Sequence, residues 1–370
     1  MTMQYRQFGK TGLNPSVLGF GMMRMKKNED GSFDQQWTVD TLRYAIDQGL
    51  TYVDTAYVYG DSERVTGVAL QDGYREKVIL ASKMPVSNFT CEEDFDRILD
   101  EQLERLQTDH IDVYLLHALS RNSWDNKVLK YNVLQYAEKA KAAGKIRHLG
   151  FSFHDDLEAF RYILDGYDKW EFCQIQLNYM DVNYQAGLKG LEEAHARGLA
   201  VVIMEPLRGG TLANVPEHVA KALPYAPVES ALSFLWNRKE VTVILSGMSE
   251  FEQVQQNLAM ADRAQVGMLS DAEVEQIVAA GDLMRQAVSI PCTGCGYCDV
   301  CPQNIAIPEI FAIRNRMQQH GSTRAAAEEY KKLGDRDASA CISCGSCVEK
   351  CPQHIEIFTK LAKIHSWYAK

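Results

Sequence analysis

Residues 51–60, TYVDTAYVYG, join an apolar stretch typical of a buried strand to two side chains that can hold or exchange protons, Asp54 and Tyr57. A carboxylate at the end of an apolar strand needs a partner, because burial of an unpaired charge is costly. Taken alone, Asp54 is explained equally well as a residue that caps the next turn. The neighbouring strands decide between these interpretations, because a partner would have to come from them.

The same order of an apolar run followed by a helical stretch recurs along most of the chain. We expect a short amino-terminal hairpin with its turn at residues 9–15, followed by alternating strands and amphipathic helices. Helical periodicity is clearest over residues 90–106, where Thr90 and Glu93 predict a capping box, and over residues 133–143. Eight repeats of this kind favour a (β/α)8 TIM barrel over an open parallel sheet. The expected strands are residues 16–21, 51–56, 78–83, 111–119, 146–152, 172–179, 200–207 and 241–248.

In such a barrel, catalytic side chains lie at the carboxyl ends of the strands. Lys83 closes one predicted strand and His117 lies near the end of the next, so both would meet Asp54 and Tyr57 at one rim. A lysine at a strand end is often solvated, and a lone histidine is often part of the core. Four titratable side chains at the same rim are better explained as a catalytic group.

The composition is that of a globular protein and excludes several functions. The chain has 370 residues, 46% of them hydrophobic and 24% charged, with a net charge of −10. Such an acidic chain lacks the clustered basic residues that duplex nucleic acid requires. No apolar run reaches the roughly 18 residues of a membrane span, and the amino terminus lacks the basic-then-apolar order of a signal peptide. We therefore expect a cytoplasmic protein with neither a nucleic-acid nor a membrane partner.

Eight of the ten cysteines lie in two short runs near the carboxyl terminus. In a cytoplasmic chain such runs indicate metal binding before disulfides. Residues 341–352, CISCGSCVEKCP, follow the bacterial ferredoxin pattern C-x2-C-x2-C-x3-C-P, and residues 291–302, PCTGCGYCDVCP, are one residue shorter before the last cysteine. The two runs predict two 4Fe-4S clusters, with structural zinc as the alternative. The predicted metal ligands are Cys292, Cys295, Cys298, Cys301, Cys341, Cys344, Cys347 and Cys351.

The strand-end motifs give the first part of the chain a resemblance to the aldo/keto reductase superfamily, over roughly residues 3–262. The resemblance is carried by residues 54–57, 59–63, 82–83, 115–117, 150–152 and 205–207. It implies a catalytic tetrad that interconverts a carbonyl and an alcohol with a nicotinamide. Reduction of a carbonyl needs a proton donor within hydrogen-bond reach of its oxygen, and a nearby ammonium draws down the pKa of a tyrosine. The resemblance implies Tyr57 as acid/base, Lys83 as its tuner, Asp54 as the partner of Lys83, and His117 as the group that orients the carbonyl.

The same resemblance implies a pocket for NADP or NAD. Met204 stands where many members have a tyrosine stacked on the nicotinamide, and Phe153 where many have an asparagine. Ser249 and Glu252 predict a capping box, and hence an anion site, at a helix start. The basic residues that many members aim at the extra phosphate of NADP are replaced by Gly247 and Gln253. The implied contacts are Met22, Asp54, Ser152, Gln174, Pro206, Leu207, Arg208, Gly209, Ser246, Gly247, Ser249, Gln253 and Asn257.

The tail resembles an α-helical ferredoxin with two clusters, in which the fourth cysteine of each run serves the other cluster. The resemblance implies one cluster held by Cys292, Cys295, Cys298 and Cys351, and another held by Cys341, Cys344, Cys347 and Cys301. We expect residues 285–370 to form this smaller, mainly helical domain after a barrel domain over residues 1–284.

Two functions from different classes follow. The first is NAD(P)H-dependent interconversion of a small aldehyde or ketone with its alcohol, the clusters serving electron transfer or structure. The second is electron transfer between NAD(P)H and a redox-protein partner, which needs a flavin because a hydride carries two electrons and a cluster accepts one; the sequence has no flavin motif. A cofactor sensor with an inert barrel is disfavoured by the tetrad. Substrate contacts would come from residues 120–130 and 210–227, which contain Trp124 and Tyr225.

Overall fold

The computed structural model describes residues 3–368, and the chain divides into two compact units. The first unit comprises Met1–Pro206 and Leu232–Leu269, and the second comprises Leu207–Ala231 and Ser270–Lys370. The expected domain boundary between residues 284 and 285 falls inside helix α11 (Asp271–Ala287) and remains a prediction. None of the helices in residues 3–368 has the length and apolar character needed to cross a membrane.

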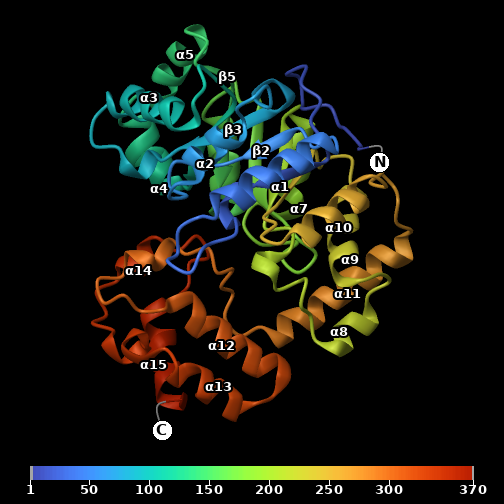
Figure 1. The fold of residues 1–370 in the computed structure, drawn as a ribbon, viewed down its shortest axis with the longest axis vertical. Coiled ribbons are helices and arrows are strands. Elements are labelled where there is room, and N and C mark those ends of the chain that lie inside the picture. The colour runs from blue at the N-terminus through green and yellow to red at the C-terminus, as the bar shows by residue number, and fades with distance from the viewer. Residues whose placement is uncertain (1–2, 369–370) are drawn as a thin grey trace. The chain divides into compact units, whose positions relative to one another are not determined.

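Within residues 3–368, eight parallel strands close into a barrel, in which each strand pairs with its sequence neighbours and β1 pairs with β8. The predicted (β/α)8 barrel is therefore confirmed, and every predicted strand is present. Figure 1 shows strands β2, β3 and β5 with helices α1 and α2 nearby. Near-continuous burial along the strands explains why the apolar runs predicted them. The strands are β1 (Leu18–Gly21), β2 (Tyr52–Asp54), β3 (Ile79–Met84), β4 (Ile111–Leu119), β5 (Ile146–Phe153), β6 (Phe172–Gln176), β7 (Ala200–Met204) and β8 (Val243–Ser246).

The predicted amino-terminal hairpin is present, and it closes one end of the barrel. Tyr5 and Ser16 form an antiparallel bridge. Phe8 is fully buried, and its ring centroid lies 6.0 Å from that of Tyr52 and 5.3 Å from that of Phe172, at the amino-terminal ends of their strands. Because Phe8 closes the amino-terminal end of the barrel, an active site can form only at the carboxyl ends of the strands.

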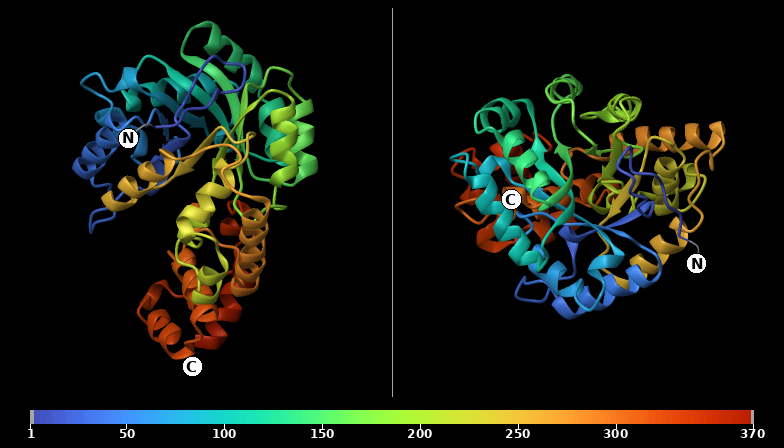
Figure 2. Two further views of the ribbon diagram at one scale, coloured as in Figure 1. Left: turned by 90° about the vertical axis from the view of Figure 1, so that its right-hand side faces the viewer. Right: turned by 90° about the horizontal axis from the view of Figure 1, so that it is seen from above.

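Helices cover the outside of the strands (Figure 2). In α3 the apolar side chains predicted to share one face, among them Phe95 and Leu99, are buried. The predicted capping box at its start is wrong: the Thr90 hydroxyl donates to the carboxylate of Asp94, the first helical residue, over 3.0 Å. The helices of the first unit are α1 (Gln35–Asp47), α2 (Ser62–Ala69), α3 (Asp94–Leu106), α4 (Arg121–Ser123), α5 (Val133–Ala142), α6 (Leu157–Asp165), α7 (Gly187–Ala196) and α10 (Phe251–Ala261), and α9 (Pro227–Trp236) continues into it from the second.

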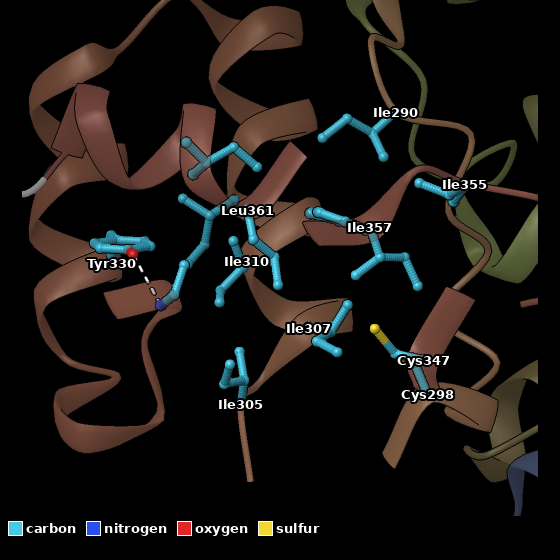
Figure 3. Close-up of a cluster of buried hydrophobic side chains, with 14 of the residues drawn as sticks. Ile290, Cys298, Ile305, Ile307, Ile310, Tyr330, Cys347, Ile355, Ile357 and Leu361 are labelled. Carbon is cyan, nitrogen blue, oxygen red and sulfur yellow. Dashed lines mark hydrogen bonds between the residues drawn. The ribbon is translucent and has the colours of Figure 1, made fainter. Parts of the chain in front are cut away.

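The second unit is helical and has its own core. Isoleucines from the segments that flank the cysteines pack around Ile310 and Leu361, and the buried thiols of Cys298 and Cys347 lie at the edge of this cluster (Figure 3). The Tyr330 hydroxyl accepts a hydrogen bond from Ala338 N over 3.0 Å. The helices of this unit are α8 (Glu217–Ala222), α11 (Asp271–Ala287), α12 (Ile307–His320), α13 (Thr323–Lys331), α14 (Ser346–Glu349) and α15 (Ile357–Tyr368).

Candidate active site and cluster-binding cysteines

Lys83 and Asp54 form a buried ion pair at the carboxyl ends of β3 and β2. The Lys83 Nζ atom donates to Asp54 Oδ1 over 2.6 Å and to the Thr55 carbonyl over 2.7 Å. The Lys83 side chain is completely inaccessible to solvent. Burial lowers the pKa of Lys83, and the Asp54 carboxylate opposes that shift. The strand register brings the two residues together, because Asp54 pairs with Ala81, two residues before Lys83.

His117 lies on the next strand, β4, and is 7% exposed. Burial, reinforced by the positive charge of Lys83, holds the pKa of His117 well below its usual range. The imidazole is therefore neutral at physiological pH and carries one N–H donor. Ala118, the next residue, has a left-handed backbone with φ of 52°, and its N–H donates to Ser152 Oγ over 2.7 Å. This hydrogen bond ties the end of β4 to β5.

Tyr59, and not Tyr57, lies beside this pair. Lys83 Nζ is 4.9 Å from the centroid of the Tyr59 ring, and the same ring lies edge-on to His117 with 5.9 Å between centroids. The Tyr57 hydroxyl donates instead to Glu101 Oε2 on α3 over 2.9 Å, and the Arg105 guanidinium covers its ring at 4.2 Å. The expectation that Tyr57 meets Lys83 is wrong.

The turn after β2 explains why Tyr59, and not Tyr57, lies beside Lys83. Tyr59 N donates to the Ala56 carbonyl over 3.1 Å, so the chain reverses direction immediately after the strand. Tyr57 faces outward to α3 at this reversal, whereas Tyr59 comes back toward the strand ends. Both residues carry the same chemistry in the sequence, and only the path of the turn separates them.

Several of the expected nicotinamide contacts lie at the strand ends of the first unit. Gln174 is buried on β6, its Nε2 lies 3.6 Å from Met204 Sδ, and its Oε1 has no hydrogen-bond partner among the described residues. Asn257 Nδ2 donates to Ser246 Oγ over 3.0 Å. Met22 is fully buried at the end of β1. A buried amide oxygen without a partner fits a cofactor that brings its own donor, such as a carboxamide.

The predicted capping box of Ser249 and Glu252 is not formed. Helix α10 has Glu250 as its N-cap, without a side-chain hydrogen bond, and Ser249 N donates to Gln253 Oε1 over 3.0 Å. A basic residue that was not predicted, Arg24, lies near Gly247. A Cβ atom added to Gly247 would lie 3.1 Å from the Cβ of Arg24.

Three other residues singled out in the sequence have packing roles in the structure. Phe153 faces the helix layer, where its ring lies 5.0 Å from that of Phe160. Trp124 is buried against Trp170, so it is not a pocket wall. The Tyr225 hydroxyl donates to Glu273 within the second unit.

Four loop residues were expected to contact the nicotinamide cofactor. Leu207, Arg208 and Gly209 belong to the second unit, whereas Pro206 is the last residue of a segment of the first unit. Arg208 is 2% exposed. Its positive charge acts on the Cys292 thiol of the same unit, where it opposes the effect of burial, which raises the pKa of Cys292 to about 11. The structure therefore places Arg208 near one of the cysteine clusters.

The cysteines gather in two sets, each drawn from both runs. Cys292 lies within electrostatic reach of Cys295 and of Cys351 from the other run. Cys298 in turn lies within reach of Cys292 and Cys295. These four are the set that the ferredoxin resemblance implies.

The second set likewise combines three cysteines of one run with the last cysteine of the other run. One cavity is lined by Cys301 from the first run and by Cys341, Cys344 and Cys347 from the second. The two halves have matching backbones, because Gly296 and Gly345 both adopt a left-handed conformation before the helical turns that carry Cys298 and Cys347. Any side chain would be strained at these two glycines.

Among residues 3–368, no group of three His, Cys, Asp or Glu side chains has the arrangement that holds a single metal ion. A 4Fe-4S cubane does not need such a group, since each cysteine binds a different iron atom. Each set of four cysteine thiols supplies the ligands that a 4Fe-4S cluster needs.

Two family models match the chain. The model described as the aldo/keto reductase family matches residues 17–282, and the model described as a 4Fe-4S dicluster domain matches residues 291–356.

Relatives are found for the first of these regions. Aldo-keto reductase YhdN of Bacillus subtilis is 34% identical over 40% of this chain and 47% of its own length, so the chain spans about half of that relative. L-galactose dehydrogenase of Arabidopsis thaliana is 29% identical over 74% of this chain and 94% of its own length. The structure of aldo-keto reductase AKR11C1 from Bacillus halodurans superposes with a TM-score of 0.62 at 24% identity, covering 75% of this chain and 96% of that one, which shows a shared fold.

Proposed function

Because the chain belongs to the aldo/keto reductase family, we propose that its barrel interconverts a small aldehyde or ketone and the corresponding alcohol, with Tyr59 as the acid/base. The observation that carries this proposal is the buried Lys83 ammonium, which lies between the Asp54 carboxylate at 2.6 Å and the face of Tyr59 at 4.9 Å, with neutral His117 beside the same ring. Oxidoreductase activity is also what the names of the relatives describe, as reductase and dehydrogenase.

Each of these side chains has a separate task. In carbonyl reduction the Tyr59 hydroxyl donates a proton to the oxygen as charge develops on it. The Lys83 ammonium favours the phenolate that remains, and Asp54 holds that ammonium in place. His117, which is neutral, donates an N–H to the carbonyl oxygen and orients it. The nicotinamide, when bound, supplies the hydride.

The cofactor pocket proposed for the barrel uses Gln174, whose buried Oε1 is available to the carboxamide, together with Ser152 and Met22 at neighbouring strand ends. Ser246, Gly247, Ser249, Gln253 and Asn257 would face the adenosine phosphate, with Arg24 as an additional cation beside Gly247. Arg24 is partly engaged by Glu205 at 3.4 Å. A single basic residue of this kind is compatible with either NADP or NAD.

For the tail we propose two 4Fe-4S clusters with crossed ligands. The crossing ties the two ends of the domain together, which supports a structural role, and each cluster exchanges single electrons when bound. A cytoplasmic location and a small-molecule substrate agree with these activities. The electron-relay alternative would add a flavin and a redox-protein partner, and no side-chain arrangement in the described residues favours it over the first function.

An anaerobic titration tests the proposal. We expect the iron-loaded protein to consume NADPH or NADH when a panel of aldehydes and ketones is added, and to oxidise alcohols, L-galactose among them, in the reverse direction. NADPH or NADH alone should leave the visible absorbance of the clusters unchanged. A hydride delivers two electrons together, a cluster accepts one, and the sequence has no motif for a flavin that would pass the electrons on singly. Rapid bleaching without an added flavoprotein would favour the relay.

A further inference from the structure

Glu63, on α2, is a fully buried carboxylate that the mechanism above does not use. Its Oε1 atom accepts hydrogen bonds from Ser82 Oγ and from Gln102 Nε2, both over 2.6 Å, and its Oε2 lies 3.4 Å from Arg105 on α3. Burial raises the pKa of Glu63, while these hydrogen bonds and the charge of Arg105 lower it. Burying a carboxylate in this way is expensive, and a hydrophobic side chain is often as stable in such a place.

The hydrogen bonds around Glu63 lead to the backbone of Lys83. Gln102 Nε2 also contacts Ser82 Oγ at 2.9 Å and the Lys83 carbonyl at 3.2 Å. The Tyr114 hydroxyl donates to Gln102 Oε1 over 2.5 Å, which fixes the direction of the amide. One side chain, Gln102, therefore joins the Glu63 carboxylate to the strand that carries Lys83.

The charge of Glu63 is not cancelled by Arg105. The Arg105 guanidinium is closer to Glu101, at 2.5 Å, than to Glu63, at 3.4 Å. Arg97 also lies near Glu101, at 3.9 Å, but it pairs more closely with Asp94, at 2.7 Å. Glu63 and Glu101 therefore keep one net negative charge beside Arg105. That charge acts on the Lys83 ammonium together with the carboxylate of Asp54.

The other titratable side chains near Glu63 do not cancel its negative charge. The charged and titratable side chains that face it are Lys83 on β3, Arg105 on α3 and Tyr114 on β4. Helix α1 also packs on α2, but its Arg43 pairs with Asp72 at 2.9 Å.

We propose that Glu63 is a positioning residue that holds Lys83 in place through Gln102 and supplies the second negative charge that keeps its ammonium ionised beneath Tyr59. The inference rests on the proposed function of the barrel. It also gives a purpose to the orientation of Tyr57, because the hydrogen bond from Tyr57 holds Glu101 against Arg105.

The Glu63→Gln variant tests this role through the pH dependence of alcohol oxidation, in which Tyr59 acts as a base. Without the Glu63 charge, Lys83 loses its proton at lower pH, and a neutral amine no longer stabilises the phenolate. We expect the alkaline decline of kcat to move toward neutral pH by on the order of one unit, the effect of one nearby charge. At the optimum kcat should fall roughly tenfold while KM for the nicotinamide is unchanged.

Two further variants separate this role from a loss of stability. Glu101→Gln, which changes a partly exposed side chain, frees Arg105 to neutralise Glu63 and should shift the decline in the same direction by a smaller amount. The control is Glu171→Gln, which removes a hydrogen-bonded carboxylate beside Lys141 and His148 at the amino end of β6. It should lower the melting temperature but leave the pH profile unchanged.

An activity-independent measurement distinguishes failure of the inference from failure of the proposed function. An NMR pH titration of the cofactor-free protein, labelled with 13C at the lysine ε carbons and with the Lys83 signal assigned by its loss in Lys83→Met, reports the pH at which the buried Lys83 loses its proton. We expect Glu63→Gln to lower that pH relative to the wild type. An unchanged Lys83 profile in Glu63→Gln would overturn the positioning role even if no substrate were turned over, whereas an inactive wild type with the expected Lys83 shift would count against the proposed function alone.

Discussion

Replacement of Tyr59 by phenylalanine lowers kcat for carbonyl reduction by a factor of about 10²–10⁴, the contribution expected of a positioned general acid. The physical reason is the loss of the hydroxyl from the ring that faces the Lys83 ammonium at 4.9 Å, because that positive charge favours the phenolate. Binding of the nicotinamide, measured by fluorescence, should be retained, because the variant removes one oxygen atom and no charge. Steady-state reduction of the best carbonyl substrate under anaerobic conditions measures the effect.

Tyr57→Phe is the matched control two residues earlier. It removes the hydrogen bond to Glu101, a change that lowers the free energy of unfolding by about 0.5–1.5 kcal/mol. We expect its kcat to stay close to that of the wild type. The assignment of the two tyrosines fails if Tyr57→Phe is the inactive variant and Tyr59→Phe retains turnover.

Pairs of cysteine substitutions reveal which cysteines share a cluster. In the crossed arrangement Cys292 and Cys351 serve one cluster, so replacing both by serine should remove about four of eight iron atoms, as replacing either one does. Cys292 and Cys301 serve different clusters, although they come from one run, so their joint replacement should remove nearly all of the iron. Iron and sulfide analysis after anaerobic reconstitution makes the comparison.

The Cys91→Ser variant is the control for these pairs, because Cys91 is exposed and belongs to neither run. Its iron content should equal that of the wild type. The opposite pattern, with half of the iron left in the Cys292 and Cys301 pair and none in the Cys292 and Cys351 pair, would mean that each run holds its own cluster.

The barrel could be predicted from the sequence because burial imposes a simple pattern on it. Parallel strands covered by helices are apolar along their whole length, so all eight runs were visible, and Phe8 in the hairpin closes the end opposite the site. The capping boxes at Thr90 and Ser249 were not predictable in this way. Both spacings were present, but Asp94 and Gln253 offered competing hydrogen-bond acceptors that the pattern does not weigh.

The sequence predicted that Asp54, Lys83 and His117 lie together at the strand ends, but it pointed to the wrong tyrosine. Asp54, Lys83 and His117 lie on strands, where register and alternation fix the direction of each side chain. Tyr57 and Tyr59 lie in a turn, where direction depends on backbone dihedrals that the sequence does not display. Residues 59–63 carry part of the family resemblance, but no separate role was predicted for Glu63, because a glutamate in the first turn of a helix normally faces water. In the structure it is buried against Ser82 and Gln102.

Transfer of deuterium from the nicotinamide tests the central claim most directly. The protein is mixed anaerobically with a carbonyl substrate and with NADPH or NADH that carries deuterium at the transferable position, and the product is examined by mass spectrometry and NMR. Direct hydride transfer in the barrel predicts one deuterium on the former carbonyl carbon of the alcohol. Product without deuterium, with the label released to water, would contradict the account and route the electrons through the clusters.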